Sequence, residues 1–334
     1  MKIVVRMPNW IGDVLFALPA VESLKAAYPG AEVWLAGNAW LKDLIDGEAA
    51  ERTVILPDLR TWKALRAAAR SIKARNFDLG LLLTNSFSSA LLFSRAGIPE
   101  RWGYRGEGRR FLLTKSRPKK AEAPPAHMVY YYLRLLEGLG MKTVPPEIKL
   151  AVPVGVRERA RTMLRDLGAD FEKRLVLLNP GAAFGPAKRW PASRFAELAQ
   201  RLQDEKNVQV ALTGAAADAS TAEAISSALV HKPLNLAGRT TLSEFLGVIS
   251  RAAVFVTNDT GPMHMANALR VPVIGIFGPT DPRATAPFHA PATVIKKDGI
   301  PCWPCLNREC PFDHRCMLEI SAAEVFEAAA ACLP

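Results

Sequence analysis

The sequence lacks the short motifs that mark the commonest cofactor-dependent and metal-dependent enzymes. Neither half carries Gly-x-Gly-x-x-Gly after its first predicted strand, so a dinucleotide oxidoreductase loses its main support. There is no Gly-x-Ser-x-Gly elbow, no His-Glu-x-x-His and no convincing Asp-x-Asp pair. These absences weaken the hydrolase and the metal-dependent transferase interpretations.

Long apolar runs are missing as well. The N-terminal sequence MKIVVRMPNWIGDVLF runs directly into charged and turn-forming residues, without the apolar core of a membrane span or an export signal. Only five cysteines occur, and four of them lie in one short segment instead of being spread along the chain as a disulfide framework. We therefore expect a cytoplasmic protein.

Acidic residues are outnumbered, with 32 Asp and Glu against 43 Lys and Arg, and the difference of +11 favours an anionic partner. Most of the excess lies in residues 1–150, where 23 basic and 14 acidic residues give a net charge of +9. Residues 101–120 alone hold eight basic residues and one Glu, interleaved with three aromatic residues. Nucleic acid, an acidic membrane surface or an anionic glycolipid would suit this stretch, and a solvated basic loop is the simpler alternative.

Two domains are expected, because 334 residues exceed what one hydrophobic core usually holds. Short β-rich runs alternate with helical stretches, which is typical of an α/β fold with a doubly wound parallel sheet, and the pattern restarts after residue 150. We predict domains at 1–150 and 151–334, with ligands outside the carboxyl ends of the strands. A last helix at 321–331 begins with Ser-x-x-Glu and is compatible with packing on either half. The predicted strands lie at 2–5, 33–36, 53–56, 78–83, 174–181, 208–214, 253–259 and 272–278.

The first strand leads into the motif PNWIGDVLFALPA at residues 8–20. Gly12 permits a tight turn, and Asp13 falls in the first turn of the following helix. The Asp13 carboxylate then has two interpretations: a cap that accepts backbone N–H groups, or a general base that takes the proton from an attacking hydroxyl. This motif alone favours the cap.

Two motifs of the second half place anion-binding groups directly after strands. NPGAAFGPAKRWP (179–191) combines glycines that allow close backbone approach with Lys188 and Arg189, which suits a phosphate, although it is not a Walker A loop. In VTNDTGPMHMANAL (256–269), Pro262 begins a helix whose first N–H groups form an anion site, and His264 lies in its first turn. Surface charges and ordinary helix-start chemistry are the simpler interpretations.

A fourth motif, PCWPCLNRECPFDHRC (301–316), gathers four thiols, with His314 as a substitute ligand. A Cys-x-x-Cys pair followed by two further cysteines is compatible with a structural zinc site, but the second pair lacks the close spacing of zinc knuckles. Reduced thiols and an oxidised pair are the alternatives. The candidate metal ligands are Cys302, Cys305, Cys310 and Cys316.

Taken together, the four ordered motifs, with FGPTDP after the third, resemble those of the ADP-heptose:lipopolysaccharide heptosyltransferases over nearly the whole chain. The resemblance implies a GT-B glycosyltransferase architecture, in which two Rossmann-like domains face a central cleft, the first binding the acceptor and the second the nucleotide sugar. It implies inverting transfer from ADP-L-glycero-D-manno-heptose, without a required cofactor or a catalytic metal. The form of NPGAAFGPAKRWP favours transfer to the first heptose of the inner core, and another core position is the alternative within the family.

The resemblance also implies roles for individual residues. Asp13 matches the general base, while Lys188 and the helix start at 259–264 match the groups that stabilise the ADP leaving group. The implied donor-binding residues, with two weakly defined positions at 218 and 241, are Gly181, Lys188, Asp218, Thr241, Asp259, Thr260, Gly261 and His264. The expected acceptor-binding residues, whose cations suit the carboxylates and phosphates of an inner core, are Asn9, Trp10, Gly12, Arg101, Arg105, Arg109, Arg110, Lys119 and Lys120.

This interpretation predicts a nucleotide-sugar donor, an anionic lipopolysaccharide acceptor, peripheral contact with the inner face of the cytoplasmic membrane and no nucleic acid. A nucleotide-sugar epimerase or a non-catalytic binding protein on a similar frame is a second hypothesis. An epimerase needs no acceptor cleft, so the basic stretch and Asp13 argue against it. A nucleic-acid-binding protein is suggested by charge alone, since no nucleic-acid-binding fold is recognisable.

Overall fold

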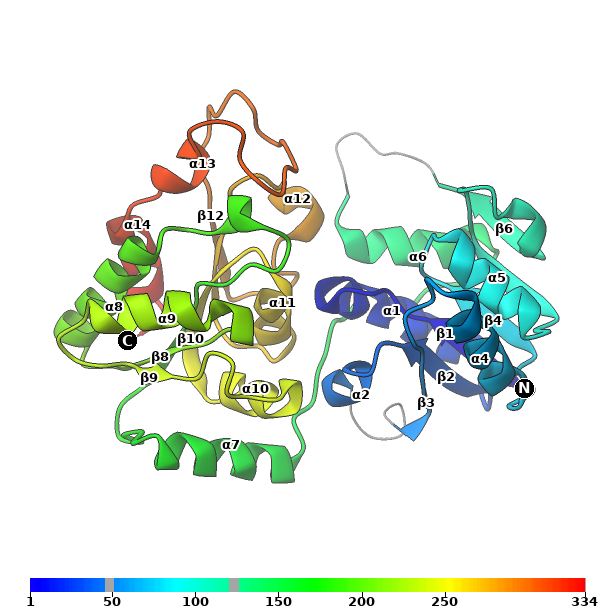
Figure 1. Ribbon diagram of the computed structural model, residues 1–334, viewed down its shortest axis with the longest axis horizontal. Coiled ribbons are helices and arrows are strands. Elements are labelled where there is room, and N and C mark those ends of the chain that lie inside the picture. Colours follow the sequence, from blue (N-terminus) through cyan, green and yellow to red (C-terminus); the bar gives the residue numbers. More distant parts are fainter. Residues whose placement is uncertain (46–50, 120–125, 334) are drawn as a thin grey trace. The chain divides into compact units, whose positions relative to one another are not determined.

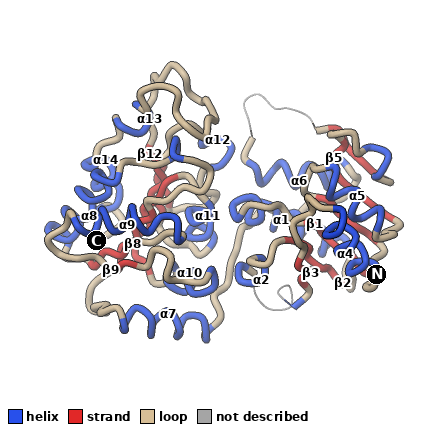
Figure 2. Tube along the Cα trace, in the orientation of Figure 1, coloured by secondary structure: helices blue, strands red, loops and turns tan. Residues whose placement is uncertain are grey.

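The computed structural model describes residues 1–45, 51–119 and 126–333, which form two compact units, Met1–Lys149 and Leu150–Pro334. Each unit contains a six-stranded parallel sheet with helices packed on it (Figures 1 and 2). The α/β class expected from the strand and helix alternation is therefore confirmed. No helix in the described ranges is both long enough and apolar enough to span a membrane.

The sheet of the first unit has the strand order β3-β2-β1-β4-β5-β6. The order reverses between β1 and β4, which pair directly with Ile3 opposite Leu79. Because parallel strands end at the same edge, the loops that follow β1 and β4 come together there. The strands are β1 (Lys2–Arg6), β2 (Glu32–Gly37), β3 (Thr53–Ile55), β4 (Leu79–Leu82), β5 (Glu100–Arg105) and β6 (Lys115–Pro118).

The helices of the first unit form two packed pairs. Helix α1 packs against α6, and α4 packs against α5. The bounds are α1 (Ile11–Ala27), α2 (Leu41–Leu44), α4 (Trp62–Lys73), α5 (Phe87–Arg95) and α6 (Met128–Gly138), with a 3-10 turn η1 (Arg110–Leu112).

The second unit repeats this topology, because its order β12-β11-β10-β7-β8-β9 is the same arrangement counted from β7. Its order reverses between β7 and β10, which also pair directly. The strands are β7 (Leu175–Asn179), β8 (Gln209–Leu212), β9 (Leu234–Asn235), β10 (Ala252–Asn258), β11 (Val273–Ile276) and β12 (Ala292–Ile295).

Helices of the second unit cover its sheet, joined by two 3-10 turns. The last helix packs against α8, β11 and β12, so of the two possibilities left open by the sequence, the structure shows packing within the second unit. The helices are α7 (Val154–Asp166), α8 (Ala192–Lys206), α9 (Ala219–Ser227), α10 (Leu242–Ile249), α11 (Gly261–Ala268), α12 (Pro282–Thr285), α13 (Arg315–Leu318) and α14 (Ala322–Ala330), with η2 (Pro186–Lys188) and η3 (Ala216–Asp218).

Each sheet contributes to an apolar core. The central strands β4 and β7 are buried along their full length, as parallel strands covered on both faces must be. In the second unit the rings of Trp190 and Phe195 pack edge to face, 4.9 Å apart, and Trp190 Nε1 donates to the carbonyl of Ile320 at 3.0 Å. The indole therefore satisfies its polar group inside the core.

The basic stretch at 101–120 is more structured than the solvated loop considered from the sequence. Strands β5 and β6 lie in it, joined through η1, and β6 forms one edge of the sheet. Charged side chains on an edge strand are common, because they discourage pairing with other chains. The stretch is therefore a rigid support for some of its cations.

Candidate active site

A buried ion pair stands at the carboxyl edge of the second sheet. Lys188 Nζ lies 2.5 Å from Asp259 Oδ2, and the two side chains are 12% and 4% exposed. Lys188 ends η2 in the loop after β7, whereas Asp259 directly follows β10. The second and third sequence motifs, 71 residues apart at this pair, therefore meet where the strand order reverses.

Two further contacts hold this ion pair. Thr280, in the turn after β11, donates its hydroxyl to Asp259 Oδ2 at 2.7 Å, and Trp303 Nε1 donates to the Thr280 carbonyl at 3.1 Å. The Lys188 ammonium also lies 5.1 Å from the ring centre of Phe184, within cation–π range. Because each ion has several fixed neighbours, the ammonium is held in one place at the edge.

Helix α11 begins beside this pair. Thr260 occupies its N-cap position without a side-chain cap bond, and Pro262 lies in its first turn. The first N–H groups of a helix have no intrahelical acceptor and carry a partial positive charge, so they attract anions. Thr260 and Gly261 are partly exposed, while His264 is buried. Lys188 and the start of α11 thus place an ammonium group and a helix N-terminus side by side at one edge of the sheet.

Gly181 and Asp218 contact each other in the loops that follow β7 and β8. A Cβ atom at position 181 would overlap the Asp218 carboxylate, so a larger residue there must displace that side chain. Asp218 is buried, accepts from the N–H of Ala215 at 3.1 Å and pairs with Arg189 at 3.1 Å. The sequence placed Asp218 among the donor-binding residues, and in the structure its carboxylate fixes two loops.

Thr241 also has a structural contact where a donor contact was expected. It is the N-cap of α10, and its hydroxyl accepts from the N–H of Glu244 at 3.2 Å. The Glu244 carboxylate accepts in return from the Thr241 N–H at 2.8 Å. This reciprocal capping box satisfies the start of α10.

Asp13 lies at the corresponding edge of the first unit, in the first turn of α1 and half-buried. Burial and the Asp13 charge raise the pKa of Tyr132 well above its ordinary value, so the Tyr132 hydroxyl stays protonated and hydrogen-bonds the Asp13 carboxylate. The neighbouring Tyr131 hydroxyl accepts from Asn85 Nδ2 at 2.7 Å, and Asn85 follows β4. Two tyrosines of α6 thus link the segments that follow β1 and β4.

A buried arginine, Arg6, holds the PNW segment (residues 8–10) that precedes Asp13. Arg6 Nη2 donates to Asn9 Oδ1 at 2.7 Å, and burial lowers the pKa of Arg6 to about 10, which leaves it charged at neutral pH. Asn38 Nδ2 donates to the Asn9 carbonyl at 3.3 Å. These contacts leave Trp10 56% exposed and Gly12 half-buried. The segment offers an exposed indole beside a carboxylate.

Four of the expected acceptor-binding cations line one groove, and three of them are exposed. Arg105, Arg110 and Lys119 are exposed and line a groove of about 540 Å³ together with Asn85. Lys119 Nζ lies 5.6 Å from the ring centre of Tyr131, the neighbour of Tyr132. This groove, which we call the acceptor groove after the binding role expected from the sequence, therefore adjoins the residues around Asp13.

Arg109, the fourth of these cations, also lines this groove, but its side chain is held by the protein. It is fully buried, and its guanidinium donates twice to the Tyr104 carbonyl, at 3.0 and 2.7 Å, and to the Thr84 carbonyl at 2.7 Å. Burial lowers its pKa. A buried guanidinium needs such acceptors to replace water, so Arg109 fastens the loop after β4 to β5.

Arg101 is likewise engaged, since its guanidinium donates to the Leu112 carbonyl at 2.7 Å and to the Ile98 carbonyl at 2.5 Å. These bonds brace β5 against η1, which leaves little of the side chain for a ligand. Lys120, the last of the expected cations, lies outside the described residues.

The cysteine segment shows free thiols. Among the described residues, no cluster of three or more His, Cys, Asp or Glu side chains is arranged to hold a metal ion. Cys316 packs in the core of the second unit, and burial, followed by the three nearby thiols, raises its pKa to about 11. Its thiol is therefore protonated at neutral pH, as expected of a structural cysteine.

Three residues of these edges were not singled out from the sequence. Thr280 lies in the motif FGPTDP directly after a strand, and that position was an available signal. Tyr132 and Arg6 carry no local signal, because their contacts depend on how α6 and β1 pack.

A family model described as glycosyltransferase family 9 (heptosyltransferase) matches residues 65–315. The chain belongs to this family. Lipopolysaccharide heptosyltransferase 2 of Escherichia coli (strain K12) is 36% identical over 310 residues, and that of Salmonella typhimurium is 35% identical over 309 residues. Each alignment covers 89% of this chain and 88% of the relative.

The solved structure of E. coli ADP-heptose LPS heptosyltransferase II has a TM-score of 0.83 at 30% identity, covering 100% of this chain and 98% of that one. This chain is thus a GT-B glycosyltransferase of the heptosyltransferase family, which acts in lipopolysaccharide core biosynthesis. The family resemblance and the GT-B architecture expected from the sequence are confirmed.

The contact between Gly181 and Asp218 generates a stability prediction. We expect Gly181→Ala to lower the free energy of unfolding by about 1–3 kcal/mol, because the new methyl group displaces the Asp218 carboxylate. In an Asp218→Ala background the same change should cost less than about 1 kcal/mol, since the obstructing oxygens are gone. Denaturant unfolding of the four proteins measures this coupling, and equal costs in both backgrounds would disprove the contact.

Proposed function

We propose that this glycosyltransferase moves L-glycero-D-manno-heptose from ADP-heptose to the first heptose of a lipopolysaccharide inner core, with inversion at the anomeric carbon. The observation that carries this proposal is the convergence of the Lys188 ammonium and the start of α11 at one edge of the second sheet. The E. coli relative of known structure is described as an ADP-heptose LPS heptosyltransferase II, and its chain matches this one along almost its whole length. That correspondence supports the same donor here.

The leaving group explains why such an edge is useful. When the bond between the anomeric carbon and the β-phosphate oxygen breaks, its electron pair stays with ADP, whose negative charge grows. Lys188 and the first N–H groups of α11 would stabilise this charge without a metal ion. Asp259 keeps the ammonium in place, and as an anion it suits the heptose hydroxyls better than the phosphates. Thr260, Gly261 and His264 complete the proposed donor site.

The acceptor hydroxyl must lose a proton as its oxygen bonds to the anomeric carbon. We assign that proton to the Asp13 carboxylate, which Tyr132 orients through its hydrogen bond. The acceptor groove, with Arg105, Arg110 and Lys119, supplies positive charge for the acidic groups of an inner core. We place this reaction at the cytoplasmic side of the inner membrane.

In this proposal Asp218 and Thr241 stabilise the donor-binding unit, because their polar atoms fix its loops. An epimerase binds no acceptor, so the acceptor groove argues against that alternative.

A heptose-transfer assay tests the proposal directly. With ADP-heptose and an acceptor that ends in the first heptose, we expect ADP release and a product heavier by one heptose, measured by mass spectrometry. Transfer only to an acceptor that ends in Kdo would assign the chain to a different core position, and ADP release without any acceptor would contradict the proposal.

Asp13→Asn should lower kcat by about 10² to 10⁴, because the acceptor hydroxyl then lacks its proton acceptor. Asp43→Asn, at an exposed position of the same unit, should leave kcat unchanged.

The Lys188 assignment needs two variants, because Lys188→Met leaves the buried Asp259 carboxylate without its cation. We expect this variant to lose about 3 kcal/mol of stability and Lys188→Met/Asp259→Asn to recover most of it. Turnover should remain about 10² to 10³ lower in both, because the leaving group still lacks its cation. If the double variant regained normal turnover, Lys188 would have only a structural part. Unfolding curves and transfer rates, measured on the same preparations, separate these results.

A further inference from the structure

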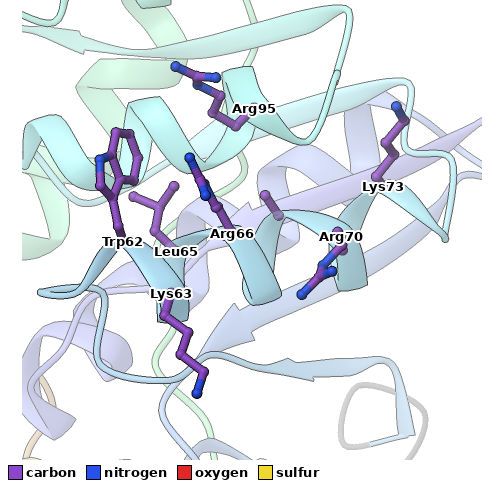
Figure 3. A pocket seen from close by; sticks show the side chains of 8 residues that line it. Trp62, Lys63, Leu65, Arg66, Arg70, Lys73 and Arg95 are labelled. Carbon is purple, nitrogen blue, oxygen red and sulfur yellow. The ribbon is translucent and has the colours of Figure 1, made fainter.

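A second basic groove lies on the first unit, on the outer face of α4 beside the end of α5. It measures about 740 Å³, and none of its lining residues belongs to the candidate active site. Five of its lining residues are basic, and among the described residues none that line it is acidic. In Figure 3 the side chains of Trp62 and Arg66 extend from α4 toward the helix that carries Arg95.

The sequence of α4 explains this face. Leu65, Ala68, Ala69 and Ile72 are buried on the inner side of the helix. Residues 59–75, by contrast, contain six Lys or Arg and no Asp or Glu. The helix is therefore amphipathic, with an apolar side in the core and a basic side in solvent.

Like charges on this face are close neighbours. Arg66 and Arg70 are four positions apart, and Arg70 and Lys73 are three apart, which are the spacings at which side chains of a helix meet. All three are exposed, and no described carboxylate forms an ion pair with them, with Lys63 or with Arg95. Their mutual repulsion destabilises the helix slightly, and an external anion would relieve it.

One exposed aromatic residue lies among these cations. Trp62 is 55% exposed, and the guanidinium groups of Arg66 and Arg95 each lie 5.7 Å from its ring centre. An indole beside cations suits the boundary between water and lipid, where the apolar ring enters the headgroup layer and the cations meet phosphates.

We propose that this face, which we call the α4–α5 face and which carries Trp62, Lys63, Arg66, Arg70, Lys73 and Arg95, is a docking surface for a bilayer that contains anionic phospholipids. Four of its cations lie along the 12 residues of α4, a length of about 18 Å, which matches several headgroups rather than one small anion. A single-stranded nucleic acid would call for successive aromatic platforms, and this groove offers one ring.

This docking surface goes beyond the proposed reaction, and binding to vesicles is measured without donor or acceptor. The full chain should sediment with phosphatidylcholine vesicles that contain about one third phosphatidylglycerol, and should not sediment with phosphatidylcholine alone. Raising the salt from about 0.1 M to about 1 M should release it, because the Debye length falls from about 10 Å to about 3 Å. Equal binding to both kinds of vesicle, or binding to neither, would overturn the proposal.

A matched pair of variants separates this face from net charge. Arg66→Gln/Arg70→Gln/Lys73→Gln should weaken partition to the acidic vesicles by about a hundredfold, at about fivefold for each cation. Arg157→Gln/Arg159→Gln/Arg165→Gln removes the same charge from exposed positions of α7 and should change it less than about threefold. Similar losses in both variants would show that only net charge matters, which would overturn the assignment to α4.

Two further sets of variants distinguish the effect of charge from a folding defect and test the part of the aromatic ring. Arg66→Lys/Arg70→Lys retains the charge and should keep near-normal partition, so a folding defect cannot imitate the loss. Trp62→Ala should weaken partition severalfold, whereas Phe312→Ala, at an exposed ring of the second unit, should not. Binding of single-stranded RNA to the wild type but not to the α4 variant, with vesicles binding neither protein, would assign the surface to nucleic acid. In that case the proposal would fail.

Discussion

The chemistry that we propose for the second unit depends on one buried ion pair, the Lys188 ammonium held against the Asp259 carboxylate. Removing two charges from water is expensive, and the pair persists because Thr280, Phe184 and neighbouring backbone surround it with fixed dipoles. The arrangement joins the turns that follow β7, β10 and β11. A leaving diphosphate that reached this edge would meet a cation already in position, so little reorganisation would be needed as its charge develops.

The two units share a strand order but present different chemistry at the corresponding edge. After β1 the first unit presents a half-buried carboxylate, Asp13, with a protonated tyrosine behind it. Its buried arginines, Arg6 and Arg109, are held by an amide oxygen and by carbonyl groups, and they act as internal fasteners of the loops. In the proposed reaction, one topology thus supports a proton acceptor in one unit and an anion-stabilising edge in the other, because function depends on the residues that follow the strands.

Regular strands were readable from the sequence, because fully buried parallel strands are continuous apolar runs, such as residues 78–83 and 174–179. Strands β5 and β6 were not, since an edge rich in Arg and Lys has the composition of a loop. The positions of Lys188 and Asp259 after strands were likewise predictable from local pattern. Charge counting did not predict how Arg101 and Arg109 are held, because it cannot distinguish a cation that faces solvent from one that is bonded to carbonyl groups.

Contacts between segments that are distant in the sequence could not be predicted from the local pattern either. The pairing of Asp218 with Arg189 and that of Tyr132 with Asp13 exist only once separate helices and loops have packed. The sequence marked Asp218 as polar and close to a strand, which suits a ligand contact and a loop brace equally well.

The central claim is that the donor diphosphate binds at the Lys188 edge. A crystal structure of the full chain with ADP-2-deoxy-2-fluoro-heptose, a donor analogue whose fluorine slows cleavage of the anomeric bond, tests it most directly. We predict that the β-phosphate lies within hydrogen-bond distance of Lys188 Nζ and of the first N–H groups of α11, with the heptose toward Asp259. A diphosphate bound in the first unit, or one that leaves the Lys188 edge empty, would contradict the account.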